Sequence, residues 1–143
     1  MKTTLDIKEP GLNVLPPGVE RHVVNGGGLT AFQLFPDDEV EIINDEGNQI
    51  CEIICFNKDG KSEVGILNLK ENSDKNFIRD ILNEKDETIL ATNYQLKKRN
   101  LNITQSKSSI VFDKDTPPGE KIKLKSKDKC YAIFSAPSED MLV

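Results

Sequence analysis

The chain has 143 residues, of which 36% are hydrophobic and 30% are charged, and its formal net charge is −5. This composition is typical of a soluble globular domain, and the length suffices for one core without metal or disulfide support. No apolar run approaches the roughly 20 residues that span a bilayer, and the first ten residues lack the apolar segment of a secretory signal. We therefore expect a cytoplasmic location and no membrane partner.

The three cysteines, Cys51, Cys55 and Cys130, are expected to be reduced thiols. Four residues of an extended strand span about 13 Å, so Cys51 and Cys55 would lie too far apart for a disulfide or a shared metal ion. The single histidine, His22, excludes sites built from several histidines. We predict that no metal and no other cofactor is bound.

Three parts are expected along the chain. Residues 1–20 are predicted to form an extended arm, because Pro10-Gly11 and Pro16-Pro17-Gly18 are turn signals. A single β-rich domain is expected over 21–136, followed by a C-terminal tail over 137–143.

The domain opens with two predicted strands, 21–24 and 29–35, separated by three consecutive glycines. Glycines in a row invite comparison with a phosphate-binding loop. The lysine and hydroxyl residues of that motif are absent, so a flexible connection between strands is the better interpretation.

The strongest local signal lies in residues 40–57, where two β-rich runs are joined by Asp45-Glu46-Gly47-Asn48. Turn residues between Ile- and Val-rich runs predict a β-hairpin. Alternation after the turn assigns two sets of side chains to opposite faces of the second strand: Gln49, Cys51, Ile53 and Cys55 to one, and Asn48, Ile50, Glu52, Ile54 and Phe56 to the other. Glu52 thus falls among apolar neighbours, where a carboxylate needs a partner or a chemical role.

One helix is predicted over about 73–84. Ser73 is its expected N-cap, and Phe77, Ile78, Ile81 and Leu82 form an apolar stripe that would cover one face or the open end of the β structure. The other segments are predicted as short strands: 64–69, 88–91, 94–96, 101–104, 110–112, 121–124 and 130–134. Short strands at regular spacing predict a mainly β fold, a barrel or a sandwich, with this one covering helix.

Charge is distributed unevenly along the chain. Residues 37–63 carry nine acidic and two basic side chains, and residues 94–130 carry ten basic and four acidic ones. This asymmetry could orient a charged ligand, bring two copies together, or pair the two regions within one molecule. Lysines at every second position from 121 to 129 are typical of a protected edge strand. They lack the interleaved aromatic residues of a nucleic-acid site, so no nucleic-acid partner is expected.

The segment Glu46-Gly47-Asn48-Gln49, with residues 40–45 before it and Phe56-Asn57 and Glu63 after it, resembles the urea-carboxylase-associated domain family. Pro16-Pro17-Gly18 and Asp115-Thr116 extend the resemblance over about the central two-thirds of the chain. It implies a mostly β fold and, in some members, a link to carboxyguanidine deimination. Related domains are joined to aminomethyltransferases of the glycine-cleavage type.

The chain departs from the pattern expected of an active member. That pattern has an acidic residue soon after the glutamine and a His-Asp pair towards the C-terminus. Here Cys51-Glu52 follows Gln49, and no histidine follows His22. The resemblance therefore implies an accessory or ligand-binding domain rather than a self-sufficient hydrolase.

Two functions remain open. The first is an accessory domain that binds a small polar nitrogenous molecule, such as an amine, amidine, urea or amino acid, beside a partner enzyme or a second copy. Its polar site would consist of Asn48, Gln49, Glu52 and Glu63, whose amides and carboxylates form directional hydrogen bonds. These side chains could equally close a turn and satisfy strand edges. The second is an enzyme acting on carbon–nitrogen bonds, with Glu52 as general base or Cys55 as nucleophile.

Overall fold

The computed structural model describes residues 2–6, 19, 21–73, 75–83 and 87–138. Most of the expected N-terminal arm and of the C-terminal tail lies outside the described residues. Residues 2–6 of the arm form a strand that pairs with two others. No helix in the described part of the chain is long and apolar enough to cross a membrane.

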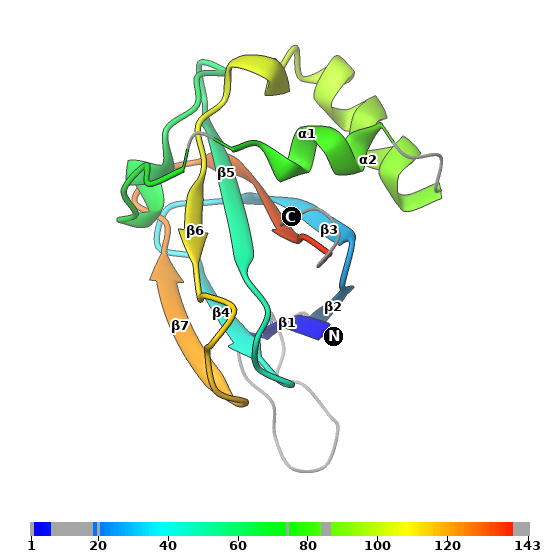
Figure 1. Ribbon diagram of the computed structural model, residues 1–143. Coiled ribbons are helices and arrows are strands. Elements are labelled where there is room, and N and C mark those ends of the chain that lie inside the picture. The colour runs from blue at the N-terminus through cyan, green and yellow to red at the C-terminus, as the bar shows by residue number, and fades with distance from the viewer. Residues whose placement is uncertain (1, 7–18, 20, 74, 84–86, 139–143) are drawn as a thin grey trace.

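Two four-stranded antiparallel sheets make up the β structure (Figure 1). The first contains, in spatial order, β2 (Arg21–Asn25), β1 (Lys2–Asp6), β4 (Glu39–Asn44) and β7 (Glu120–Lys125). The second contains β3 (Gly28–Leu34), β8 (Cys130–Ala136), β5 (Cys51–Asn57) and β6 (Ser109–Val111). The predicted mainly β fold is confirmed. Strand pairing among the described residues does not close a barrel, so the sandwich alternative fits better.

Side chains from both sheets fill the space between them. Ile42 and Leu124 come from the first sheet, and Cys51, Ile53 and Phe134 come from the second. All five are nearly or completely removed from solvent. The predicted alternation of β5 is confirmed here, because Cys51 and Ile53 share this face.

Two helices cover the opposite face of the second sheet, α1 (Phe77–Leu82) and α2 (Glu87–Lys98) (Figure 1). Ile54 and Phe56 of β5 pack there against Ile78 and Ile81 of α1. Strand β5 is therefore buried on both faces, between the first sheet and the helices. This position explains its nearly continuous apolar sequence.

The predicted hairpin is wrong, because β4 and β5 belong to different sheets. Strand β4 pairs with β1 and β7, whereas β5 pairs with β6 and β8. The turn residues were identified correctly, but they carry the chain from one layer of the sandwich to the other. A strand that is apolar on both faces buries more apolar surface in the middle layer than in a hairpin with one exposed face, and this burial stabilises the fold.

The helical region differs from the prediction in extent. Helix α1 is shorter than 73–84, and its N-cap is Asn76, whose side chain accepts a hydrogen bond from the Arg79 N–H. The strands predicted at 88–91 and 94–96 are wrong, because both segments lie in α2. The buried residues of α2 recur at helical spacing: Ile89, Thr92 and Leu96. Short apolar runs in a sequence do not distinguish the buried face of a helix from a strand.

Two further predicted strands are short 3₁₀ helices. Val64–Leu67 forms η1, within the strand predicted at 64–69, and Ile103–Gln105 forms η2, which overlaps the strand predicted at 101–104. The strands predicted at 21–24, 29–35, 110–112, 121–124 and 130–134 are confirmed within one to two residues at their starts or ends.

The lysine-rich strand β7 is an edge of the first sheet, as predicted. Its neighbour is the acidic strand β4, and the Lys123 Nζ lies 3.8 Å from the Glu39 Oε2. The Lys125 Nζ lies 3.7 Å from a carboxylate oxygen of Asp37. Part of the acidic region therefore pairs with part of the basic region inside one molecule.

Candidate functional site

Glu52 lies on the face of β5 that the helices cover, and its side chain is fully buried. Its two carboxylate oxygens accept hydrogen bonds from the backbone N–H groups of Phe77 and Ile78, at 3.0 and 2.8 Å. The Ser108 hydroxyl donates a third bond, at 3.4 Å. The first N–H groups of a helix have no acceptor within the helix, so the carboxylate satisfies two of them for α1. Glu52 thus has the partner that its apolar surroundings require.

Burial raises the pKa of Glu52 above its usual value, and the hydrogen bonds from Phe77, Ile78 and Ser108 oppose this rise. A general base must reach a proton of the substrate. Here both carboxylate oxygens are already bonded to groups of the fold. The geometry therefore favours a structural role for Glu52.

The segment Gly47-Asn48-Gln49 forms the crossing from β4 to β5. Gly47 and Asn48 both adopt the left-handed conformation, with φ of 75° and 57°. A Cβ atom on Gly47 would lie 2.7 Å from the Pro118 nitrogen and 2.8 Å from the Thr116 carbonyl oxygen. The Asn48 N–H donates to that same Thr116 oxygen at 2.7 Å. The crossing is thus packed backbone against backbone, where only glycine fits at position 47.

Gln49 links this crossing to the segment after β8. Gln49 is only 4% exposed, and its Nε2 donates to the carbonyl oxygens of Ile50 and Pro137, each at 2.9 Å. The backbone carbonyl oxygen of Gln49 accepts a hydrogen bond from the Asn44 Nδ2 at 2.7 Å. The buried Asn44 Oδ1 has no hydrogen-bond partner among the residues that the structure describes. The neighbouring Asn48 side chain is exposed.

Glu63 lies beyond the other end of β5, just before η1, and is exposed. Its backbone N–H donates to the Cys55 carbonyl oxygen at 2.7 Å. The structure therefore places Gln49, Glu52 and Glu63 in three different surroundings. None of them is a lining residue of the pocket described below.

The three cysteines are free and buried. A hydrogen bond with Cys130, together with burial, raises the pKa of Cys55. The same hydrogen bond lowers the pKa of Cys130, and the Ser126 hydroxyl, 3.5 Å from the Cys130 Sγ, acts in the same direction. A nucleophilic cysteine requires the thiolate, so these surroundings do not favour Cys55 in that role.

Metal ligands do not cluster in the part of the chain that the structure describes. No group of three or more His, Cys, Asp and Glu side chains could hold a metal ion there.

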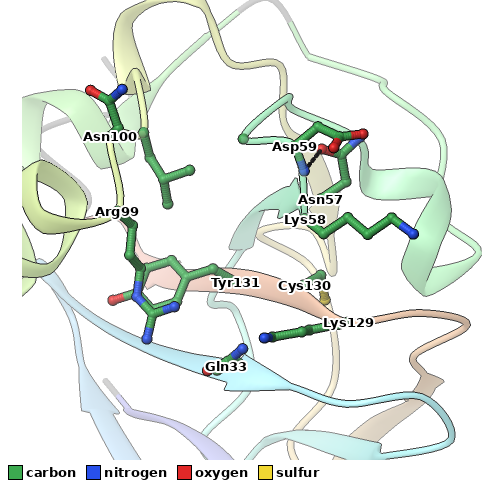
Figure 2. Close-up of a pocket in the computed structure, with 11 residues that line it drawn as sticks. Gln33, Asn57, Lys58, Asp59, Arg99, Asn100, Lys129, Cys130 and Tyr131 are labelled. Carbon is green, nitrogen blue, oxygen red and sulfur yellow. Dashed lines mark hydrogen bonds between the residues drawn. The ribbon is translucent and has the colours of Figure 1, made fainter.

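A cavity of about 410 Å³ opens at the end of the second sheet (Figure 2). It is formed by the turn after β5, the residues that follow α2, and the start of β8. Its lining residues are Gln33, Asn57, Lys58, Asp59, Gly60, Arg99, Asn100, Leu101, Lys129, Cys130 and Tyr131. Sequence reasoning missed this pocket and interpreted Lys129 only as part of the alternating lysines of an edge strand. No short-range pattern indicates it, because segments far apart in the sequence build it.

Comparison with known proteins gives one informative match. Over 131 residues, or 92% of this chain, the sequence is 30% identical to the trimethylamine-oxide aldolase of Ruegeria pomeroyi. The chain spans only 17% of the length of that relative. No family model and no solved structure matches the chain. The resemblance to the urea-carboxylase-associated family therefore stays a prediction.

Proposed function

We propose that this chain is an enzyme-associated domain that binds a small nitrogenous molecule. The proposal rests on the match to a longer protein that is named as an aldolase. This match covers 92% of this chain but only 17% of that protein. A segment of this size is typical of one domain in a larger protein. The resemblance described above suggests aminomethyltransferases of the glycine-cleavage type as the partner enzyme, and the three free thiols suit a cytoplasmic location.

The proposed ligand is an amine, amidine, urea or amino acid. The relative's name refers to trimethylamine oxide, which is also a small nitrogenous molecule. Among the predicted site residues, Asn48 and Glu63 have exposed side chains that could contact a ligand directly. Gln49 and Glu52 would act indirectly, by holding the β4–β5 crossing and helix α1 in place.

Thermal-shift screening with guanidine, ureido compounds and amino acids tests ligand binding. We expect at least one class to raise the melting temperature of the wild type, because a ligand that binds only the folded state stabilises it. Gln49→Ala should weaken this response relative to its own unliganded melting temperature, whereas Gln95→Ala on α2 should not. An unchanged response in Gln49→Ala would remove Gln49 from the site. A wild type that responds to no class would contradict the proposal.

A second candidate is an enzyme acting on carbon–nitrogen bonds, because the relative is itself named as an enzyme and its name refers to a nitrogenous molecule. Deiminase- or amidohydrolase-like activity would release ammonia from amidines or ureas. Ammonia release from a panel of these substrates should therefore be compared between the wild type and Glu52→Gln. Turnover that depends on Glu52 would support catalysis, and no turnover in either protein would favour binding. The hydrogen bonds of Glu52 lead us to expect the second result.

A further inference from the structure

The pocket shown in Figure 2 differs in charge from the rest of the molecule. The chain carries a net charge of −5, yet three cationic side chains and one carboxylate line this pocket: Lys58, Arg99, Lys129 and Asp59. A concave surface lined mainly by one sign of charge concentrates ions of the opposite sign. The pocket therefore suits a ligand with an anionic group.

Arg99 is held in a defined position at one side of the pocket. It directly follows α2, and its backbone N–H donates to the Gln95 carbonyl oxygen at 3.0 Å. Its guanidinium carbon lies 4.7 Å from the centre of the Tyr131 ring, and Tyr131 as a residue is only 7% exposed. Cation–π stacking on a fixed ring restricts the guanidinium without using its N–H donors.

The N–H donors of Arg99 have no carboxylate partner among the described residues. A planar guanidinium with free donors matches a carboxylate, which can accept two parallel hydrogen bonds. Arginine is preferred over lysine for this geometry. This guanidinium, which has no carboxylate partner in the part of the chain that the structure describes, is therefore the strongest candidate for a ligand contact in the pocket.

Other lining groups complement Arg99. Figure 2 shows the Lys129 side chain directed towards the side of the pocket where Gln33 and Arg99 lie. The Lys129 Nζ is 5.9 Å from the centre of the Phe35 ring, which supports its stem. Asn57 and Asp59 lie across the pocket from Arg99 in the same view. The pocket thus has a cationic side with Arg99 and Lys129, and a facing side where an amide and a carboxylate lie beside the third cation, Lys58.

We propose that this pocket binds a small zwitterionic ligand of the amino-acid type. Its carboxylate would pair with Arg99, assisted by Lys129, and its cationic nitrogen would face Asp59. The volume of about 410 Å³ lies within the range of small-molecule sites. This inference rests on the proposed function, whose ligand class it narrows to molecules that carry a carboxylate.

Calorimetric titration with two matched ligand pairs tests the inference. L-Arginine is compared with agmatine, and guanidinoacetate with methylguanidine, because each pair differs by a carboxylate. The wild type should bind the carboxylate member of a pair at least tenfold more tightly. Arg99→Gln should lose this preference, and Arg99→Lys should keep part of it because the charge remains. The matched control is Lys98→Gln, which removes one charge from the last turn of α2 without altering the pocket lining.

The outcomes separate this inference from the proposed function. Equal binding within both pairs, or a preference that survives in Arg99→Gln, would overturn the inference and leave small-molecule binding intact. Binding of inorganic phosphate in place of the carboxylates, lost in Arg99→Gln, would also overturn it. Failure of all four compounds and of the thermal-shift panel would overturn both. Melting temperatures of Arg99→Gln and Lys98→Gln without ligand show whether either variant has lost its fold.

Discussion

Glu52 is a buried carboxylate that joins β5 to the start of α1 and to Ser108. Because burial raises the pKa of this carboxyl above its usual 4.5, the folded chain holds the Glu52 proton more tightly than the unfolded chain does. The stability that Glu52 contributes through this proton is fully present below pH 4.5. It is lost as the pH rises through the raised pKa.

Glu52→Gln keeps the shape of the side chain and removes its titration. We expect the variant to be less stable by about 1–3 kcal/mol at low pH, because the amide NH2 cannot accept a backbone hydrogen bond, whereas both oxygens of the protonated carboxyl keep acceptor capacity. This difference should shrink as the pH rises from 4.5 towards neutrality. Urea denaturation of both proteins over this range measures it. A difference that stayed constant or grew with pH would contradict the assignment.

The three thiols should differ in reactivity. Cys130 has a lowered pKa and lines the open pocket, whereas burial raises the pKa of Cys51 and a hydrogen bond with Cys130 raises that of Cys55. We expect iodoacetamide to label Cys130 first in the folded protein, since the thiolate is the reactive form. Ser126→Ala removes one contact that lowers this pKa and should slow the labelling. Mass spectrometry of labelled peptides would contradict us if Cys51 reacted as fast as Cys130.

At the scale of elements, the crossing from β4 to β5 depends on a glycine. Gly47→Ala would force an alanine into the left-handed region and place its Cβ against the backbone of Thr116 and Pro118. We expect a loss of at least about 1–3 kcal/mol in the free energy of unfolding. Gly65→Ala is the matched control, because no atom lies within 4 Å of its added Cβ. Equal stability of the two variants in urea would show that the crossing tolerates rearrangement.

The same crossing shows what could be predicted from local sequence. The turn residues, the strands on either side and the two faces of β5 were all evident from residue type and alternation. The partner strands were not, because β5 pairs with β6 and β8, which lie far along the chain. Turn chemistry indicates that a chain changes direction and does not indicate into which layer it turns.

The candidate site, too, could be predicted from the sequence only in part. The position of Glu52 among apolar residues predicted that it needs a partner, and it has one. That partner is the start of α1, which the alternation of a strand cannot indicate. Arg99 and Tyr131 come into contact only because the end of α2 lies beside β8. The spacing of residues along the chain does not predict such a contact.

At the scale of the whole molecule, the acidic and basic regions are neighbours in the first sheet. Glu39 and Asp37 pair there with Lys123 and Lys125. These side chains are largely exposed, so each pair contributes only about 0–1 kcal/mol. Their main effect is that the two charged regions partly neutralise each other within one chain.

We therefore expect no salt-dependent self-association. Sedimentation at low and high ionic strength should give the same monomeric species, because opposite charges are paired internally and exposed ones are screened over roughly 8–10 Å. A dimer that dissociates in high salt would contradict this expectation. A dimer insensitive to salt would point instead to the apolar side chains exposed on α2, Leu90 and Tyr94, at 59% and 62%.

Strand β8 lies between β3 and β5, although it is the last strand along the described chain. Pairing such distant segments requires closing a long loop before any contact is gained, which slows folding. During synthesis, β3 leaves the ribosome well before β8, and β8 is its hydrogen-bonded neighbour in the sheet. The second sheet and its pocket can therefore form only after β8 has been synthesised. Until then, the backbone edge of β3 is available to any other unpaired strand that it meets.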